Sequence, residues 1–372
     1  MKNLSKTIVL LTSLGFGCAA NAELRINGFA NLVGGITSSD DTLYGYDDKI
    51  SFSEDSLFAI QLSGDINDKM TATGQIVARG SEDYDPEFEW AYITYQATDN
   101  VSISAGRLRI PLFRYSSSLD VGYSYHWISP PQSVYDVTFN NLDGLRVDYS
   151  NYAGDWEYNI QLAAGTYENT TDVYKIEGRD TVALTAEAAY EFFKVRAVYG
   201  RAKTSIDVFG LEGAFAAFEQ VLPTKLYNDL EAVDDTGVFL GLGLEYDTFD
   251  WFVSGEITSV DTEKSYIKED IAYFLTAGLR IGKFTPSITY EVKESDDGVK
   301  FTDQISQLPA ALQAQVIGVQ AAFDDDEQAV TLGLRYDYAT NVALKAEVTR
   351  YTDDLYENSD ANLLRFAVNY IF

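Results

Sequence analysis

Two-residue alternation at the C-terminal end is the feature that most constrains the fold of this chain. In residues 362–372 one parity carries only apolar or aromatic side chains, whereas the other parity is mixed and more polar. This is the period of a β-strand with one apolar face. A strand of a soluble sandwich can show the same alternation, so the pattern becomes informative because the rest of the chain repeats it.

Alternating segments recur along the whole chain, and we expect sixteen strands. They lie at residues 24–36, 57–64, 70–79, 88–97, 101–109, 144–150, 156–166, 181–191, 193–203, 237–247, 251–261, 271–281, 285–294, 328–338, 342–352 and 362–372. The links between them are alternately long and short, and short helices are expected in two long links, at 211–221 and 304–322. This asymmetry is typical of an outer-membrane barrel with tight periplasmic turns and large external loops. The predicted fold is therefore an all-β, transmembrane antiparallel β-barrel of 16 strands.

The first residues have the organisation of a secretory signal peptide. A positively charged start precedes an apolar run at 8–16, and small residues at 20 and 22 form a cleavage site. The peptide is expected to cover residues 1–22, and one barrel domain residues 23–372. The only cysteine, Cys18, lies within the peptide, so the mature chain is expected to form no disulfide.

The charge of the chain argues against nucleic-acid partners. The net charge is −30, and cleavage would remove two lysines and no acid, which lowers it to −32. The hydrophobic content of 46% is nevertheless too high for a disordered chain. We therefore expect a folded, acidic protein that binds no nucleic acid.

The apolar parity of each strand is expected to face lipid, and the polar parity a lumen filled with water. One strand breaks this phase, because Ile103 shares the parity of Arg107 and Arg109. A lipid-facing arginine near the membrane midplane costs roughly 2–4 kcal/mol. We therefore predict a bulge at residues 105–106, which would turn both arginines inward and Leu108 and Ile110 outward.

Small residues occupy the outward positions of the first strands. They are Gly28, Ala30, Gly34, Ala72, Gly74, Ala78 and Ala91. Small residues let another backbone approach closely, which favours a subunit interface around the N-terminal strands. The alternative is a chance effect of a glycine-rich sequence.

The link at residues 110–143 is the longest by a small margin and is rich in aromatic residues. A barrel of 16 strands otherwise leaves a wide aqueous channel, so this link is predicted to fold inward as a constriction. Its carboxylates Asp120, Asp136 and Asp143 would then face the wall arginines Arg25, Arg79, Arg107, Arg109 and Arg146. The alternative is an external loop packed on its neighbours.

On these features the chain resembles the Gram-negative outer-membrane general (diffusion) porins. The resemblance implies an inward third loop, and a homotrimer joined through the N-terminal strands. It also implies an outer-membrane location, with lipid and lipopolysaccharide as surroundings. The signal for the outer-membrane insertion machinery would be Phe366, Val368, Tyr370 and Phe372. The Pro-Glu-Phe-Gly-Gly loop tip of enterobacterial members is missing, and residues 107–111 (RLRIP) resemble phosphate- and pyrophosphate-type porins.

The sequence contains no arrangement typical of an enzyme. Nucleophilic catalysis needs a base beside a nucleophile, and the single histidine, His126, lies between aromatics beside a double proline, where we expect it to pack. No cofactor or metal is expected. The predicted function is a channel for passive diffusion of small hydrophilic solutes, mildly selective for cations. The alternatives are a substrate-selective porin for phosphate, organic anions or sugars, and a plugged barrel that acts as an adhesin or anchor.

Overall fold

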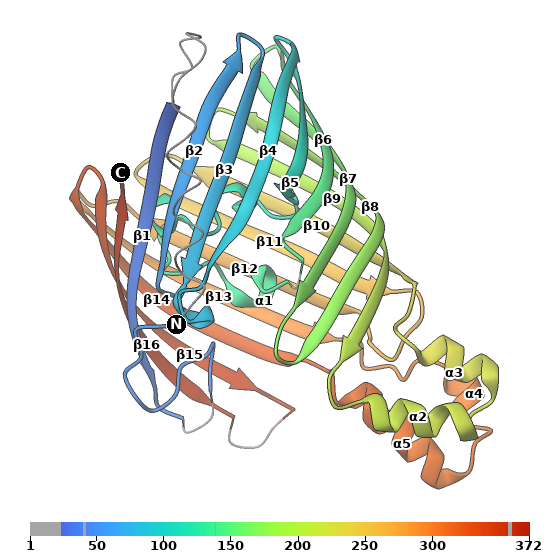
Figure 1. Cartoon of the computed structure of the whole chain (residues 1–372). Helices are drawn as coiled ribbons and strands as arrows, with labels where there is room; N and C mark the ends of the chain where they lie inside the picture. The colour runs from blue at the N-terminus through green and yellow to red at the C-terminus, as the bar shows by residue number, and fades with distance from the viewer. Residues whose placement is uncertain (1–23, 40–41, 138, 356–358) are drawn as a thin grey trace, which may run out of the picture.

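The computed structural model describes residues 24–39, 42–137, 139–355 and 359–372, so the expected signal peptide lies outside the described residues. The described chain forms 16 antiparallel strands that close into a barrel (Figure 1). The barrel closes where β1 (Leu24–Thr37) pairs with β16 (Ala361–Ile371), and β1 also pairs with β2 (Leu57–Asn67). Each strand pairs with its neighbours in sequence, which is the predicted fold.

All 16 predicted strands overlap observed strands. The others are β3 (Met70–Arg79), β4 (Pro86–Thr98), β5 (Val101–Arg109), β6 (Asn141–Ala153), β7 (Trp156–Thr170), β8 (Tyr174–Tyr190), β9 (Phe193–Val208), β10 (Asp235–Asp247), β11 (Trp251–Thr262), β12 (Asp270–Leu279), β13 (Phe284–Ser295), β14 (Asp326–Ala339) and β15 (Val342–Asp353). The largest difference is at β8, which begins seven residues before the predicted start at 181. The long link expected between β7 and β8 is instead an extension of their hairpin, in which Tyr167 pairs with Gly178.

Two long links form a small helical unit at one end of the barrel. The link between β9 and β10 contains α2 (Glu212–Val221) and α3 (Thr224–Leu230), and the link between β13 and β14 contains α4 (Thr302–Ile305) and α5 (Ala310–Ala321). These helices pack on a shared apolar core (Figure 1). Helices were predicted at α2 and at α4–α5, whereas α3 was missed. No helix in the described part of the chain is both long and apolar enough to span a membrane.

The outer face of the barrel is apolar, as the alternation predicted. On β10, for example, Leu240, Leu242 and Leu244 are 46–49% exposed, while Phe239 between the outward positions is 3% exposed. The side chains that alternation assigned to lipid therefore remain uncovered in the isolated barrel. Burying this belt in a hydrocarbon layer removes the apolar surface from water.

Two of the small outward residues are covered by aromatic rings of the same chain. The backbone of Gly28 exchanges two 2.9 Å hydrogen bonds with Phe372, and a Cβ on Gly28 would lie only 2.2 Å from the Phe372 ring. A Cβ on Gly34 would lie 2.6 Å from the ring of Phe52. These two glycines are thus required by packing within the barrel, where the sequence suggested contact with another subunit.

The bulge predicted beside Gly106 is wrong. The pairing of β5 with β6 continues past Gly106 without a register shift, and Gly106 adopts φ +135°, a conformation that glycine tolerates. The shift lies instead on β4, where Phe88 and Trp90 pair with consecutive residues of β3 and Glu89 is left between them. Leu108 and Ile110, both predicted to face outward, are 0% and 2% exposed, and Ile110 belongs to the interior cluster.

Candidate functional site: the lumen and the loop that crosses it

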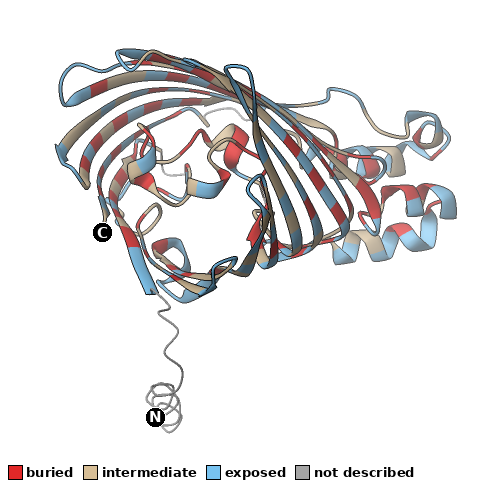
Figure 2. Ribbon diagram, turned by 90° about the horizontal axis from the view of Figure 1, so that it is seen from above, coloured by how far each residue is buried: buried red, intermediate tan, exposed pale blue. Residues whose placement is uncertain are grey.

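The described residues of the link between β5 and β6, 110–137 and 139–140, lie inside the barrel and are here called the lumen loop (Figure 2). It includes α1 (Gln132–Tyr135) and hydrogen-bonds to inner-wall residues of distant strands. The indole of Trp127 donates to Thr289 Oγ1 at 2.8 Å, and the backbone N–H of Ile128 donates to Glu347 Oε1 at 2.7 Å. The loop therefore reaches strands that follow it by more than 150 residues.

The lumen loop also contacts the seam at which the first and last strands join. Asn31 donates its amide to the Asp120 carbonyl at 2.9 Å, and a Cβ on Gly122 would lie 2.4 Å from the amide nitrogen of Asn369. The ammonium group of Lys345 donates to the carbonyl oxygens of Gly122 and Trp127. Glycine at position 122 thus allows the loop to approach the seam closely.

The lumen loop packs on the later strands through an apolar cluster. Phe113, Trp127 and Val134 of the loop are buried against inner-wall residues such as Phe239 and Phe274. Here the loop covers the wall, whereas nearer the short turns a cavity of about 340 Å³ remains between the loop and β10–β14, lined by charged residues such as Arg114, Glu245 and Arg280. The loop packs by dispersion and by removal of apolar surface from water.

The opposite half of the interior, formed by β2–β7, is polar. Its inward side chains hydrogen-bond along the wall: Gln75 donates to Gln61 at 3.1 Å, and Gln161 donates to Asp148 at 2.6 Å. Such groups need either each other or water when they leave the bulk solvent. This half has the lining that the sequence predicted for an aqueous lumen.

Three of the predicted site residues meet in one ion cluster. Asp120 of the lumen loop lies 2.6 Å from Arg109 and 3.1 Å from Arg79, and both arginines also contact Glu89 at 2.5–2.9 Å. Burial raises the pKa of Asp120, but the two guanidinium groups outweigh this effect and hold the pKa below its ordinary value. The cluster fixes the middle of the lumen loop to β3–β5.

The other predicted arginines pair with neighbouring wall residues. Arg25 lies 2.8 Å from Asp65 on β2, Arg107 lies 3.7 Å from Asp143 on β6, and Arg146 contacts a carboxylate two residues further along its own strand. The structure therefore brings Asp120 together with Arg79 and Arg109, whereas Arg25, Arg107 and Arg146 pair with carboxylates of the wall strands. The cause is register, which places acids beside these arginines on the same wall.

Asp136 differs from the other acids of the predicted set. Its carboxylate has no hydrogen-bond or ion-pair partner among the described residues. It borders two cavities, one of about 250 Å³ and one of about 200 Å³. Desolvation by the surrounding protein raises the pKa of Asp136 above its ordinary value, although the opposite charge of Lys293 lowers it.

Several charged residues that hold the lumen loop were not predicted as site residues. Arg114 lies 2.6 Å from Glu245, and Glu347, besides accepting from the loop backbone, lies 2.8 Å from Arg365. The inward parity of Glu245, Glu347 and Arg365 was visible in the sequence, but it indicated only a lumen-facing position, and Arg114 lies on the loop itself. In the structure the lumen loop buries these groups, which therefore require partners.

The described residues offer no group of three or more His, Cys, Asp or Glu side chains arranged to hold a metal ion. His126 packs between Trp127 and Phe252, with ring centroids 4.0 and 4.6 Å away, and its Nε2 lies 3.1 Å from Thr276 Oγ1. These contacts make His126 part of the packing of the lumen loop.

Solved structures of several porins have the same fold. OmpF of Salmonella typhi in complex with daunomycin is 14% identical over 94% of this chain and 98% of the other, with a TM-score of 0.60. A trimer form of OmpT of Vibrio cholerae is 14% identical over 94% and 99%, with a TM-score of 0.56. The anion-selective porin of Comamonas acidovorans is 10% identical over 94% and 100%, with a TM-score of 0.58. No curated protein matches the sequence significantly.

A closed barrel with a lipid-facing belt and an inward loop defines an outer-membrane channel protein. Residues 7–371 match the family described as Gram-negative porin, and the chain belongs to that family. It is thus a general outer-membrane porin channel of a Gram-negative bacterium, and a porin of this family is not an enzyme.

Proposed function

We propose that this porin conducts small hydrophilic solutes and ions passively, with a mild preference for cations. The supporting observation is the cavity of about 200 Å³ between the lumen loop and β1–β3. Its charged lining residues are Glu54, Asp55, Asp120, Asp136 and a single base, Arg79. Negative potential in a narrow cleft concentrates cations.

The aqueous path runs through the polar half of the interior, beside the lumen loop. Asp120 is neutralised by Arg79 and Arg109, so its role is to hold the loop in place. Asp136 faces the cavity without a cation partner among the described residues and supplies the charge that a passing ion meets. The lumen loop is in this way the constriction.

Planar-bilayer recordings test this proposal. The purified protein should produce discrete conductance steps. In a salt gradient, the sign of the reversal potential should show a preference for cations. Asp136→Asn should shift the reversal potential towards zero. Absence of steps refutes the channel, and a reversal potential on the anion side refutes the selectivity.

Anion or phosphate selectivity is the second candidate, favoured by the arginines of residues 107–111. Both of these arginines are paired, Arg107 with Asp143 and Arg109 with Asp120 and Glu89. Their charges are therefore largely balanced before a solute arrives. We expect phosphate at millimolar concentration to leave the current unchanged, and concentration-dependent block by phosphate would support this candidate instead.

We infer that the mature barrel, residues 23–372, assembles as a homotrimer in contact with lipid and lipopolysaccharide. Outward small residues of β3, such as Ala72 and Gly74, support this inference, as does the trimer form of Vibrio cholerae OmpT. We also infer that the last strand carries the signal for the insertion machinery. Its outward residues Phe366, Val368, Tyr370 and Phe372 are 39–56% exposed on the lipid-facing side.

A further inference from the structure

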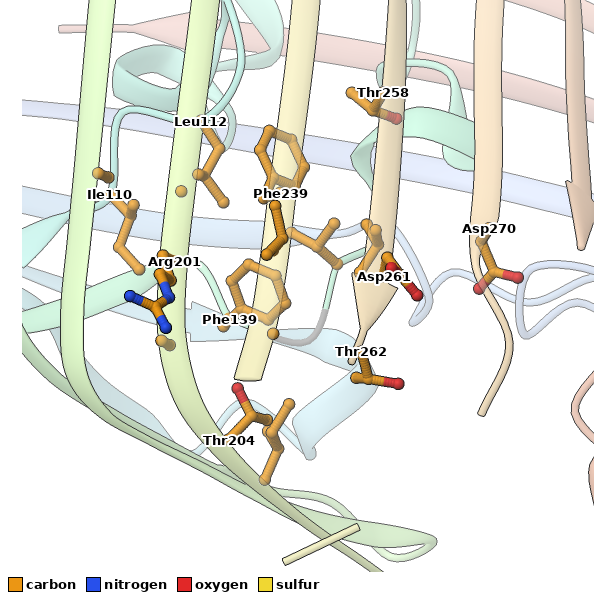
Figure 3. Close-up of a pocket in the computed structure, with 18 of the residues that line it drawn as sticks. Ile110, Leu112, Phe139, Arg201, Thr204, Phe239, Thr258, Asp261, Thr262 and Asp270 are labelled. Atoms are coloured by element: carbon orange, nitrogen blue, oxygen red, sulfur yellow. The ribbon is translucent and has the colours of Figure 1, made fainter. Parts of the chain in front are cut away.

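A cavity with apolar walls lies between the lumen loop and the inner faces of β8–β13, towards the end of the barrel with the long links (Figure 3). Its walls include Leu112, Val134, Phe139, Ile176, Phe239 and Val260. The cavity volume is about 250 Å³. An apolar cavity of about 150 Å³ accommodates benzene, so this one has room for an aromatic ring with a short chain.

The charges around this cavity are unequally balanced. Lys268 lies 2.8 Å from Asp324, and Lys293 lies 2.5 Å from Asp325. Both ammonium groups are therefore paired with carboxylates. Asp136 borders the same cavity, and its carboxylate has no partner among the described residues. The other charged residues of the lining are Asp261, Asp270 and Arg201. With Asp136, three carboxylates stand against one guanidinium, so the unbalanced charge available to a ligand is negative.

A polar atom inside the cavity also lacks a partner. The hydroxyl of Thr181 is buried without a hydrogen bond to any described residue. By contrast, the hydroxyl of Thr204, on the same wall, lies 3.2 Å from the Tyr167 hydroxyl. Buried polar atoms are normally hydrogen-bonded, so Thr181 offers an unused contact to a ligand or a water molecule.

We propose that this cavity is a binding site for small amphipathic cations of the aryl-alkylamine class. The ring packs against Phe139, Phe239 and Val260, and the ammonium group faces Asp136. An apolar pocket with a few polar groups is the usual form of a small-molecule site. This proposal rests on the proposed function only because the site lies along a lumen that conducts ions.

Single-channel recording with matched blockers tests the site. We expect 2-phenylethylammonium to interrupt the current at concentrations at least tenfold lower than either ethylammonium, which lacks the ring, or 3-phenylpropanoate, which has the opposite charge. In a series from butyl- to hexylammonium, each added methylene should tighten binding roughly fourfold. Equal block by 2-phenylethylammonium and ethylammonium would overturn the proposal.

Two variants locate the site. Ala202 of β9 lines the cavity and pairs with Gly237, which has no side chain, so a leucine at position 202 has room to fill the cavity. Ala202→Leu should therefore reduce the affinity for 2-phenylethylammonium at least tenfold. Val260→Thr keeps the shape of the wall but adds a hydroxyl group, and should reduce the affinity for 2-phenylethylammonium about threefold or more. Ala197→Leu, on the outward face of the same strand as Ala202, is the matched control and should bind as the unmodified protein does. Wild-type affinity in both cavity variants would refute the site.

Saturation-transfer difference NMR on the detergent-solubilised protein measures the same binding without conductance. Binding without conductance steps would refute the proposed channel function alone. Conductance without binding would refute this inference alone.

Discussion

Asp136 is the residue on which the proposed cation preference depends most. It lies on the lumen loop between two cavities, and its carboxylate has no cation partner among the described residues. Asp120, sixteen residues earlier on the same loop, is held by two arginines. The same residue type therefore has two roles, because one carboxylate is neutralised by its neighbours and the other is not.

The selectivity of the channel should fall as the pH is lowered. Since the pKa of Asp136 is raised, this carboxylate takes up a proton at a higher pH than an ordinary one and loses its negative charge. An ion about 4 Å from a unit charge in water gains about 1 kcal/mol, so cation preference should fall up to about fivefold. Reversal potentials between pH 7.5 and 4.5 measure this change, with Lys293 and Asp325 as the other nearby charges.

Asp136→Asn should be less cation-selective at neutral pH and should lose this part of the pH dependence. Asp143→Asn, which alters an exposed carboxylate beside Arg107, is the control and should retain it. If the unmodified protein and Asp136→Asn shifted equally with pH, another group would be responsible.

At the scale of elements, the lumen loop is held by buried polar groups of the later strands. Lys345 of β15 is 4% exposed and donates to two loop carbonyl groups, and Glu347 of the same strand accepts from the Ile128 N–H. The sheet itself is complete without these bonds. The strands and the loop can therefore be disturbed separately.

Lys345→Met should loosen the lumen loop without opening the barrel. It leaves two carbonyl groups without their donor, at a cost of about 1–3 kcal/mol for each buried group left unsatisfied. We expect a larger and noisier single-channel conductance, while the unheated protein keeps its compact mobility in SDS gels. Lys283→Met, an exposed lysine near the short turns, is the control. An unchanged conductance would show that Lys345 does not position the constriction.

The last strand offers a second test at this scale. The ring of Phe372 stacks on Tyr370 and Phe58, with centroids 5.5 and 6.0 Å apart, over Gly28. Phe372→Ala loses these contacts, worth on the order of 1 kcal/mol for each aromatic pair, and the proposed insertion signal. The amount of folded barrel in the outer membrane should fall several-fold. Phe88→Ala, on the same outer face, should leave that amount nearly unchanged.

At the scale of the whole molecule, the barrel is asymmetric around its circumference. The lumen loop covers the inner wall of the later strands, whereas the first strands have a polar inner wall and small residues outside. A trimer joined by the first strands would place the three polar half-lumens near the assembly axis. The helical unit of α2–α5 would then lie on the outer side of each barrel.

Gly74→Trp tests the trimer. A Cβ on Gly74 meets nothing within 4 Å, so the barrel itself has space for a large side chain. In an interface built on close approach, the same side chain would separate the subunits. Native mass spectrometry in detergent should show monomers for Gly74→Trp and trimers for Leu332→Trp, an outward position on β14. Trimers in both variants would place the interface elsewhere.

The sequence alone determined the strands, their order and, except at the end of β5, their two faces, because alternation is local and reports directly on which side of a sheet a residue lies. It could not determine which lumen-facing residues are exposed to water. Glu347, Lys345 and Arg365 have the parity of an aqueous wall, yet all three are buried.

Only the tertiary structure decided this, because burial depends on where the lumen loop packs. Ile128 and Glu347 are 219 residues apart in sequence but 2.7 Å apart in space. No short-range pattern encodes such a contact. The predicted arginines show the same limit, since the register between adjacent strands, and not the parity within one strand, decided which arginines pair with the loop and which with the wall.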